Sequence, residues 1–436
     1  MRPMRILRPL LAAAALAFAG QAQAVLNIEI TQGAPGARPI AIVPFGNASG
    51  VHSPVDIARL VSGDLKLSGQ FAPMKRRNMV ATPTSADQLR FSNWRTADVD
   101  NVVIGQVRAA DNGGYVVRFQ LFDVIHQRQI AGYSFHAPAN ALRGLAHEIS
   151  DVIYKKITGE RGAFNTRIAF VDSKGKKDQR QYRLLVADYD GYNARPILTS
   201  GQPIMSPAWS PDGKRIAYVS FEHGRPAVYV QQVATGKRKR VSQRKGINGA
   251  PAWSPDGKRL AMALSYQGGD PDLYVLNLSN NQLHRVTRSG GIDTSPSWTP
   301  DGKSLIFTSD RAGSPQLYRI AADGSGTAKR LTFEGNYNAA PDVSPNGKKV
   351  AFVHRNGQNQ YRIAIYDLDT GFMQVLSDGS LDESPTFAPN GRMILYATEH
   401  NDRGVLGAVS ADGSVAVRLS QAQGNIREPA WGPFRE

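Results

Sequence analysis

The carboxyl-terminal half of the chain repeats one motif at a nearly constant spacing, and this repeat limits the possible folds more than any other feature. Each copy has a proline, an apolar residue two positions later, and then a turn of the Ser-Pro-Asp-Gly type. The six copies begin at Pro207, Pro251, Pro296, Pro341, Pro385 and Pro429. Successive prolines are 44, 45, 45, 44 and 44 residues apart. A period of about 40–45 residues built from short strands indicates a β-propeller with one blade per repeat.

Each repeat also contains the other strands that a blade requires. In the copy that begins at Pro251, the turn Ser254–Gly257 is followed by the strand-like runs Arg259–Ala263, Leu273–Leu276 and Arg285–Thr287. Serine, proline, aspartate and glycine in that order favour a type I turn. We expect the aromatic residue before the turn to pack between blades, so the motif is structural and is not a functional site.

The sixth copy ends after its first strand, whereas three strands without a leading strand precede the first copy. These three are Arg167–Val171, Tyr182–Asp188 and Pro196–Thr199. A ring has no exposed sheet edge if the last strand of the chain joins them. The sequence therefore predicts a six-bladed β-propeller over residues 165–436, closed by pairing of the C-terminal strand with these N-terminal propeller strands.

Residues 25–160 show no trace of the repeat and mix strand-like with helix-like patterns. Arg38–Phe45 is typical of a buried strand, and Asp111–Gly114 of a hairpin turn. Apolar residues recur at helical spacing in Pro54–Gln70 and Leu142–Ile157. We expect a small α/β domain here, ahead of the all-β propeller.

The first 24 residues have the features of a secretory signal peptide. Three arginines precede the short apolar run Leu10–Ala19, and Ala22-Gln23-Ala24 is a small-x-small cleavage site. The run is too short to span a bilayer, and no other long apolar stretch follows. We expect export to the periplasm, cleavage near Ala24, and a mature chain without a transmembrane segment.

Charge and composition argue against several classes of function. The formal net charge is +16, of which the three signal arginines contribute 3, leaving +13, and the chain has no cysteine. Its basic residues lack the interleaved aromatics and motifs of nucleic-acid-binding proteins. A basic exported protein can instead be attracted to anionic envelope surfaces. We therefore expect no nucleic acid among the partners.

The sequence contains no recognisable catalytic constellation. There is no Gly-x-Ser-x-Gly elbow, and the pattern begun by His147-Glu148 has Asp151 where a zinc-binding helix needs histidine. We expect no catalytic, cofactor-binding or metal-binding residues and no enzymatic activity. The alternatives are a propeller that accompanies a hydrolase or peptidase, and a propeller that binds peptidoglycan.

A propeller can bring six loops together at one mouth of its channel. The leading strand of each blade is expected to be innermost, so the segments just before the repeat prolines lie on one face. Their varied side chains suit a protein interface, although ordinary connecting loops are the alternative. The candidate contact residues are Met205, Asn248, Gly249, Ala250, Asp293, Thr294, Ser295, Asn338, Ala339, Asp382, Glu383, Arg427 and Glu428.

The start of the mature chain is a second candidate binding segment. Apolar and polar residues alternate there, as they do in a strand that adds to a sheet edge. The alternative is a strand of the first domain. The residues concerned are Val25, Leu26, Asn27, Ile28, Glu29 and Ile30, within a segment of about residues 25–33.

The whole mature chain resembles the TolB family of periplasmic proteins in Gram-negative bacteria. Besides the repeat, the resemblance rests on Arg38-Pro39-Ile40, Ile157-Thr158-Gly159, Asp188–Asn193 and Leu381-Asp382-Glu383. It implies a non-enzymatic part of the Tol–Pal system, which supports outer-membrane integrity and draws the outer membrane inward at division.

The resemblance also implies partners for both candidate segments. The channel mouth is expected to bind the peptidoglycan-associated lipoprotein, with Asn248, Ala250 and Thr294 as first candidates, and the N-terminal segment to bind TolA. Other outer-membrane proteins are further candidate partners. Ile247 and Ser295 depart from the polar and acidic residues expected in relatives. If the N-terminal segment docks on the body in one state and is free in the other, the two binding events are coupled.

Overall fold

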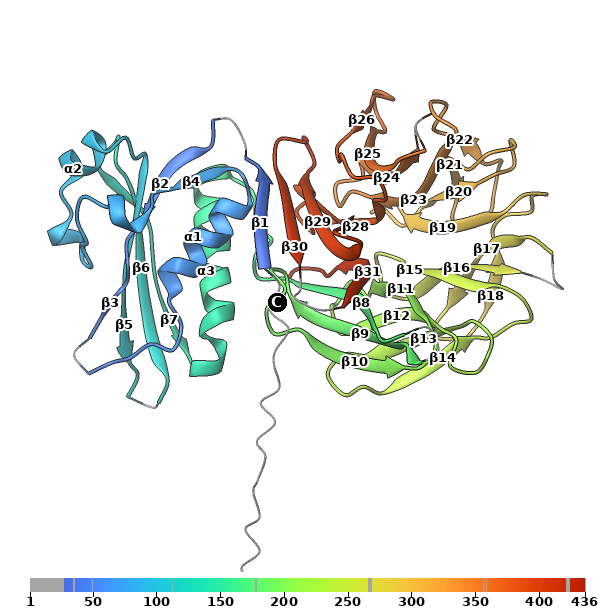
Figure 1. Ribbon diagram of the computed structural model, residues 1–436, viewed down its shortest axis with the longest axis horizontal. Helices are drawn as coiled ribbons and strands as arrows, with labels where there is room; N and C mark the ends of the chain where they lie inside the picture. Colours follow the sequence, from blue (N-terminus) through green and yellow to red (C-terminus); the bar gives the residue numbers. More distant parts are fainter. Residues whose placement is uncertain are drawn as a thin grey trace, which may run out of the picture.

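The computed structural model describes residues 27–435 with gaps at 34–35, 49, 112, 177–178, 266–268, 356, 358 and 421–423. It has a small α/β domain beside a six-bladed propeller (Figure 1). The expected signal peptide, residues 1–24, and the candidate residues Val25 and Leu26 lie outside the described residues. In the described part of the chain, no helix is long and apolar enough to cross a membrane.

The first domain is one mixed sheet with its two longer helices on the side that faces the propeller (Figure 1). The sheet order is β4-β2-β5-β6-β7, with β3 paired to β5. The strands are β2 (Arg38–Ile42), β3 (Gly46–Asn47), β4 (Phe71–Pro73), β5 (Asn101–Ala109), β6 (Tyr115–Asp123) and β7 (Arg128–Ala137). The helices are α1 (Ile57–Leu67), α2 (Phe91–Thr96) and α3 (Leu142–Thr158), with single 3₁₀ turns at Arg76–Asn78, Ala86–Gln88 and Ala139–Ala141.

Helices α1 and α3 follow the periodicity that the sequence predicts. Their apolar stripes, which include Val61, Leu65, Ile149 and Ile153, are buried against one another and against the sheet. Helix α3 ends at Gly159, whose left-handed backbone (φ 83°) lets its N–H donate to the Lys155 carbonyl at 2.9 Å. The glycine is what stops the helix and releases the chain towards the propeller.

The propeller contains the six blades that the repeat predicts, each with four antiparallel strands of the propeller sequence and its leading strand innermost. Two blades are β11 (Ile204–Trp209), β12 (Arg215–Ser220), β13 (Ala227–Gln232), β14 (Arg238–Ser242), and β15 (Asn248–Trp253), β16 (Arg259–Ser265), β17 (Pro271–Asn277), β18 (Leu283–Arg285). Two more are β19 (Asp293–Trp298), β20 (Ser304–Ser309), β21 (Gln316–Ala321), β22 (Lys329–Arg330), and β23 (Tyr337–Val343), β24 (Lys349–Arg355), β25 (Tyr361–Asp367), β26 (Met373–Val375). The fifth is β27 (Glu383–Phe387), β28 (Met393–His400), β29 (Arg403–Ser410) and β30 (Ala416–Ser420).

The sixth blade joins the two ends of the propeller sequence. The C-terminal strand β31 (Asn425–Trp431) pairs with β8 (Arg167–Lys174), which continues to β9 (Gln181–Asp188) and β10 (Arg195–Ser200). The register places Ile426 opposite Asp172 and Trp431 opposite Ile168. The predicted closure of the ring is confirmed.

The N-terminal strand β1 (Asn27–Gln32) lies in the propeller and not in the sheet of the first domain. It pairs antiparallel with β30 and makes a fifth strand of that blade (Figure 1). Glu29 is opposite Arg418, and their side chains form an ion pair at 3.3 Å. Ile30 packs on the core between this blade and the next. The segment that the sequence grouped with residues 25–160 is thus docked on the propeller.

Each leading strand is hydrogen-bonded to the leading strand of the preceding blade. In three cases the tryptophan indole N–H donates to a carbonyl: Trp209 to Ala430 (3.2 Å), Trp253 to Ala208 (3.1 Å) and Trp298 to Ala252 (3.0 Å). In the other three a backbone N–H donates to a side chain: Val343 to Ser297 (3.0 Å), Phe387 to Asp342 (2.7 Å) and Trp431 to Thr386 (3.2 Å). The six bonds run once around the ring.

The two domains meet at a buried carboxylate on α1. Asp64 accepts hydrogen bonds from the Tyr189 hydroxyl (2.7 Å) and the Ser150 hydroxyl (2.6 Å), and His147 Nδ1 lies 2.8 Å away. Tyr189 belongs to the turn between β9 and β10, which the sequence shows only as a turn. Burial opposes a charge on His147, but Asp64 and Asp190 outweigh it, and the pKa of the imidazole is raised. These side chains fix the first domain on the propeller.

The bond from the Phe387 N–H to the Asp342 carboxyl group is expected to make the stability of the protein depend on pH. Asp342 is half-buried in the channel lining, and its desolvation raises its pKa to about 7. Because this value lies above the unfolded one, the folded protein retains the proton between about pH 4 and about pH 7, and stability falls as the pH rises through that window. Asp342→Asn keeps an oxygen for the Phe387 N–H and is never charged. We expect it to be about 1–2 kcal/mol more stable than the wild type at about pH 8, in urea unfolding followed by fluorescence.

The matched control is Asp412→Asn, in a turn between two strands of the fifth blade. Hydrogen bonds from Ser410 and Ser414 outweigh the effect of burial and lower the pKa of Asp412. Its stabilising contribution is therefore present above the unfolded pKa and is lost in acid, which is the opposite sign. Equal stability of Asp342→Asn and wild type at both ends of the window would contradict the prediction.

Candidate functional site

The six leading strands surround a central channel with a cavity of about 390 Å³. Each strand contributes the repeat proline and the residues on either side of it. The candidate contact residues lie where the leading strands begin. Because the six strands begin on the same side of the ring, these residues share one mouth of the channel. The lining is a mixture of small, proline and aromatic residues, with the carboxyl groups of Asp342 and Glu428.

The residue before each repeat proline has a left-handed backbone, although none of the six is glycine. Their φ angles lie between 47° and 55°. The residues are Ser206, Ala250, Ser295, Ala340, Ser384 and Glu428. The β-ladder of every leading strand shifts register at this point. Such a conformation costs an ordinary residue about 1–2 kcal/mol, so the fold holds a ring of six strained residues at the mouth.

Four polar candidate contact residues are buried and brace their own blades. Asn248 and Asp382 are examples, with 1% and 0% of their surface exposed, and Asp293 and Asn338 are equally buried. The Asn248 amide oxygen accepts from the Ser242 hydroxyl (2.7 Å) and the Arg244 N–H (2.8 Å). These polar side chains hold the loops in place instead of offering surface to a partner.

The equivalent residues in the other blades make similar bonds. Asp293 accepts from Arg311 Nη2 at 2.9 and 2.8 Å and from the Ser289 hydroxyl at 3.0 Å. Asn338 donates to Gln316 Oε1 at 2.8 Å. Asp382 accepts from the Ser377 hydroxyl at 2.5 Å, and burial raises the pKa of this carboxyl.

Three large apolar side chains are exposed on one arc of the mouth. Met205, Ile247 and Ile292 have 41%, 47% and 43% of their surface exposed, and they belong to three consecutive blades. Only Met205 was among the candidates. Ile247 and Ile292 both stand four residues before a repeat proline, and that shared position is the signal that would have found them.

The opposite arc of the mouth is charged. Arg427 pairs with Glu383 at 3.0 Å and with Glu399 at 2.6 Å. Glu428 accepts from the Ser206 N–H at 3.2 Å, and burial raises its pKa. The remaining candidates Gly249, Ala250, Thr294 and Ser295 are half-buried in the two blades of Ile247 and Ile292, and Ala339 is buried.

The mouth therefore has the properties of a binding surface for a protein. It combines an apolar arc, a charged arc and a concave centre, as the core and rim of protein interfaces do. Among the described residues, no group of three or more His, Cys, Asp or Glu side chains is arranged to hold a metal ion.

Comparison with known proteins matches both domains to one family. The family model described as TolB beta propeller domain matches residues 154–435, and the one described as TolB amino-terminal domain matches residues 26–130. The Tol-Pal system protein TolB of Thioalkalivibrio sulfidiphilus is 59% identical over 415 residues, covering 95% of each chain. Its counterpart in Xanthomonas euvesicatoria is 50% identical over 437 residues, covering 100% of this chain and 99% of that one.

A solved structure shows the same arrangement of the chain. The crystal structure of TolB from Acinetobacter baumannii is 44% identical and superposes with a TM-score of 0.87. The match covers 94% of this chain and 100% of that chain. The curated relatives are named as components of the Tol-Pal system and not as enzymes.

The burial of Asn248 predicts that its replacement affects folding before binding. Asn248→Ala leaves the Ser242 hydroxyl and the Arg244 N–H without their partner, and we expect the free energy of unfolding to fall by about 2 kcal/mol. Thr294→Ala, at a half-buried position of the next blade, is the control and is expected to change it by about 0.5 kcal/mol or less. Urea unfolding measures both. An Asn248→Ala protein of unchanged stability that binds its partner more weakly would instead place Asn248 in the contact surface.

Proposed function

The chain belongs to the TolB family of Tol-Pal system proteins, and we propose that it is a non-enzymatic periplasmic scaffold of that system. In this role the channel mouth binds the peptidoglycan-associated lipoprotein, and residues 25–33 bind TolA. Together these contacts support outer-membrane integrity and its inward movement at division. The observation that carries the proposal is the exposed apolar arc of Met205, Ile247 and Ile292.

Exposed apolar side chains at this position favour a protein partner. Burying a large apolar side chain contributes about 1.5–3 kcal/mol, whereas its exposure to water in three consecutive blades has no benefit for the fold. The channel behind the arc holds a cavity of about 390 Å³, so a partner can seat side chains in it while its body rests on the rim. Hydrogen bonds to buried side chains such as Asn248 and Asp293 fix the loops beneath the rim in advance, which reduces the entropy lost on binding.

The apolar arc can be tested directly. We expect Ile247→Asp and Ile292→Asp each to weaken binding of the lipoprotein's periplasmic domain by about tenfold or more, since each places a charge in the apolar core of the interface. Isothermal titration calorimetry measures the affinity.

Phe372→Asp is the matched control. Phe372 is 65% exposed in the turn between β25 and β26, away from the channel lining. The Phe372→Asp variant adds the same charge as the Ile247 and Ile292 variants at another exposed position. We expect the variant to fold and to bind the lipoprotein's periplasmic domain with unchanged affinity. The proposed contact fails if the Ile247 and Ile292 variants bind as tightly as this control.

The second part of the proposal concerns the docked strand β1. As the fifth strand it covers the edge of β30, and β31, which follows β30 in the chain, carries Arg427 and Glu428 to the mouth. We propose that β1 leaves this edge to bind TolA as an added strand, and that lipoprotein at the mouth shifts the balance between the docked and free states. The ion pair between Glu29 and Arg418 and the packing of Ile30 stabilise the docked state.

A disulfide can lock the docked state. Glu29 and Arg418 are directly opposite in the antiparallel register, and the chain has no cysteine of its own. In the double variant Glu29→Cys with Arg418→Cys, we expect oxidation to abolish TolA binding and reduction to restore it, measured by calorimetry with the TolA periplasmic domain. The two single variants control for loss of the ion pair.

The outcome shows whether TolA binding requires release of β1 from the propeller. A fully cross-linked protein that binds TolA as tightly as its reduced form would show that β1 need not leave the propeller. Lipoprotein affinity that is equal in the oxidised and reduced forms would show that the two binding events are not coupled.

A further inference from the structure

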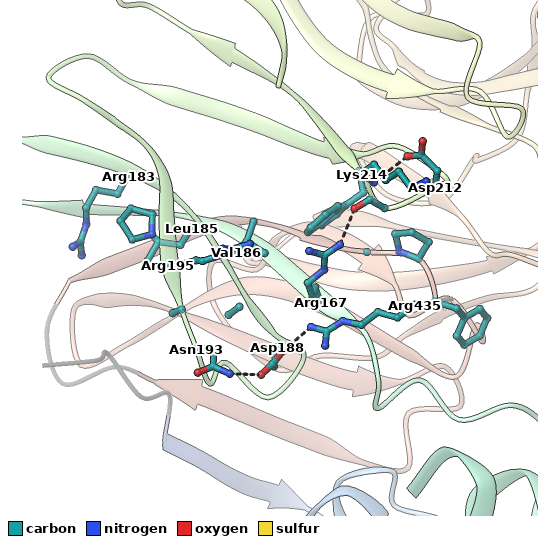
Figure 2. Close-up of a pocket in the computed structure, with 18 of the residues that line it drawn as sticks. Arg167, Arg183, Leu185, Val186, Asp188, Asn193, Arg195, Asp212, Lys214 and Arg435 are labelled. Atoms are coloured by element: carbon teal, nitrogen blue, oxygen red, sulfur yellow. Dashed lines mark hydrogen bonds and ion pairs between the residues drawn. The ribbon is translucent and has the colours of Figure 1, made fainter. Parts of the chain in front are cut away.

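A cleft of about 1140 Å³ lies away from the channel mouth. It is formed by β8, β9, β10, the turn after β11 and the C-terminal tail (Figure 2). The turn after β11 is at the end of the blade opposite the mouth. None of the candidate contact residues of the mouth lines this cleft.

The cleft gathers positive charge from segments far apart in the sequence. Six cationic side chains line it against two carboxylates, Asp188 and Asp212. The cationic residues are Arg167, Lys174, Arg183, Arg195, Lys214 and Arg435. They come from three strands, one turn and the tail, so the excess charge exists only in the folded protein.

The two carboxylates are already engaged. Asp188 pairs with Arg435 at 2.6 Å and accepts from the Asn193 amide at 3.0 Å (Figure 2). Asp212 accepts from the Lys214 backbone N–H at 3.0 Å inside its own turn. Within the described residues, the side chains of Arg195 and Lys214 have no carboxylate partner.

Arg167 lies at the centre of this charge and is held in a fixed orientation. It donates to the Gly213 carbonyl at 2.7 Å, and its guanidinium lies 4.9 Å from the ring of Trp209 (Figure 2). Burial and the nearby Arg435 and Arg195 all lower the pKa of Arg167. Arg435 also has a buried Nε without a hydrogen-bond partner among the described residues. Arg183 is paired with the buried Asp172, and Arg435 is paired with Asp188. Against the one remaining carboxylate, Asp212, the cleft therefore holds four cationic side chains that repel one another: Arg167, Lys174, Arg195 and Lys214.

We propose that this cleft binds a ligand that carries two phosphate groups. Arginine forks match phosphate oxygens with paired hydrogen bonds, and several arginines in one cleft are typical of phosphate recognition. A single carboxylate would neutralise only part of the excess charge, whereas two phosphates carry enough negative charge to neutralise it. Trp209 and Pro433 provide apolar surface for the part of the ligand between the phosphates.

The ligand can be a soluble phosphorylated sugar or a lipid headgroup, because both present the same chemistry to the cleft. Fructose 1,6-bisphosphate is the soluble probe, and fructose 6-phosphate is its single-phosphate comparison. Phosphatidylcholine vesicles containing cardiolipin, which has two phosphates, are the lipid probe. Vesicles with phosphatidylglycerol at equal total phosphate are their comparison.

The test uses the mature protein and two double variants with the same loss of charge. Arg195→Ala with Lys214→Ala removes two cations from the cleft, and neither residue belongs to the mouth or to β1. Arg225→Ala with Lys258→Ala is the control, since both are exposed and outside the cleft, and Lys258 occupies the place of Lys214 in the next blade. Calorimetry measures the sugar phosphates, and vesicle flotation measures the lipids.

We expect saturable one-to-one binding of at least one two-phosphate probe and binding about tenfold weaker, or more, for its single-phosphate comparison. The cleft variant is expected to lose about tenfold or more in affinity, and the control variant to bind like the wild type. Binding of only the sugar supports a soluble ligand, and preference for cardiolipin vesicles supports a lipid headgroup.

The proposal is overturned if neither two-phosphate probe binds saturably. It is also overturned if the cleft and control variants weaken binding equally, which would show a general effect of net charge. Lipoprotein and TolA binding of the cleft variant are expected to equal those of the wild type, so failure here is distinguishable from failure of the mouth.

Discussion

The propeller depends on one hydrogen bond that is repeated around the ring, between each leading strand and the one before it. A single blade is apolar on both faces and is not stable alone, so its position must be fixed by its neighbours. Where the repeat has tryptophan, the indole can provide the bond. Where it has Val343 or Phe387, the preceding blade provides Ser297 or Asp342 as the acceptor. Departures from the repeat in one blade are thus compensated by a side chain of the blade before it.

The same leading strands create the mouth at their other end. A register shift and a left-handed residue before each proline give the six loops the same backbone path. Buried polar residues such as Asn248 and Asp293 hold that path, so the neighbouring exposed positions are free to differ. This separation allows one arc to be apolar and the other to be charged on a symmetrical frame. The few exposed side chains then determine which partner the surface fits, and the more numerous buried polar side chains hold the loops in place.

The closing blades collect the features that distinguish this propeller from a plain ring. Strand β1 covers one edge, β31 closes the sixth blade, and the turn after β9 carries Tyr189 to Asp64 of the first domain. The basic cleft lies beside the same sixth blade. The first domain and both ends of the described chain are therefore joined to the fifth and sixth blades, and the cleft lies between the sixth blade and the first. The remaining three blades mainly complete the ring and its mouth.

Local patterns in the sequence were sufficient for the blade number, the closure of the ring and the two main helices, because turn chemistry and strand or helix periodicity act over a few residues. They did not show which edge β1 joins, because alternation identifies a strand but not its partner. They also could not show that Asn248 is buried, because a polar residue in a short segment before a proline has the same sequence pattern as a residue of an exposed loop. The basic cleft joins Arg167, Arg195 and Arg435, and only the folded chain brings these charges together. Pairing, burial and charge clustering depend on distances between remote segments, and the tertiary structure alone decides those distances.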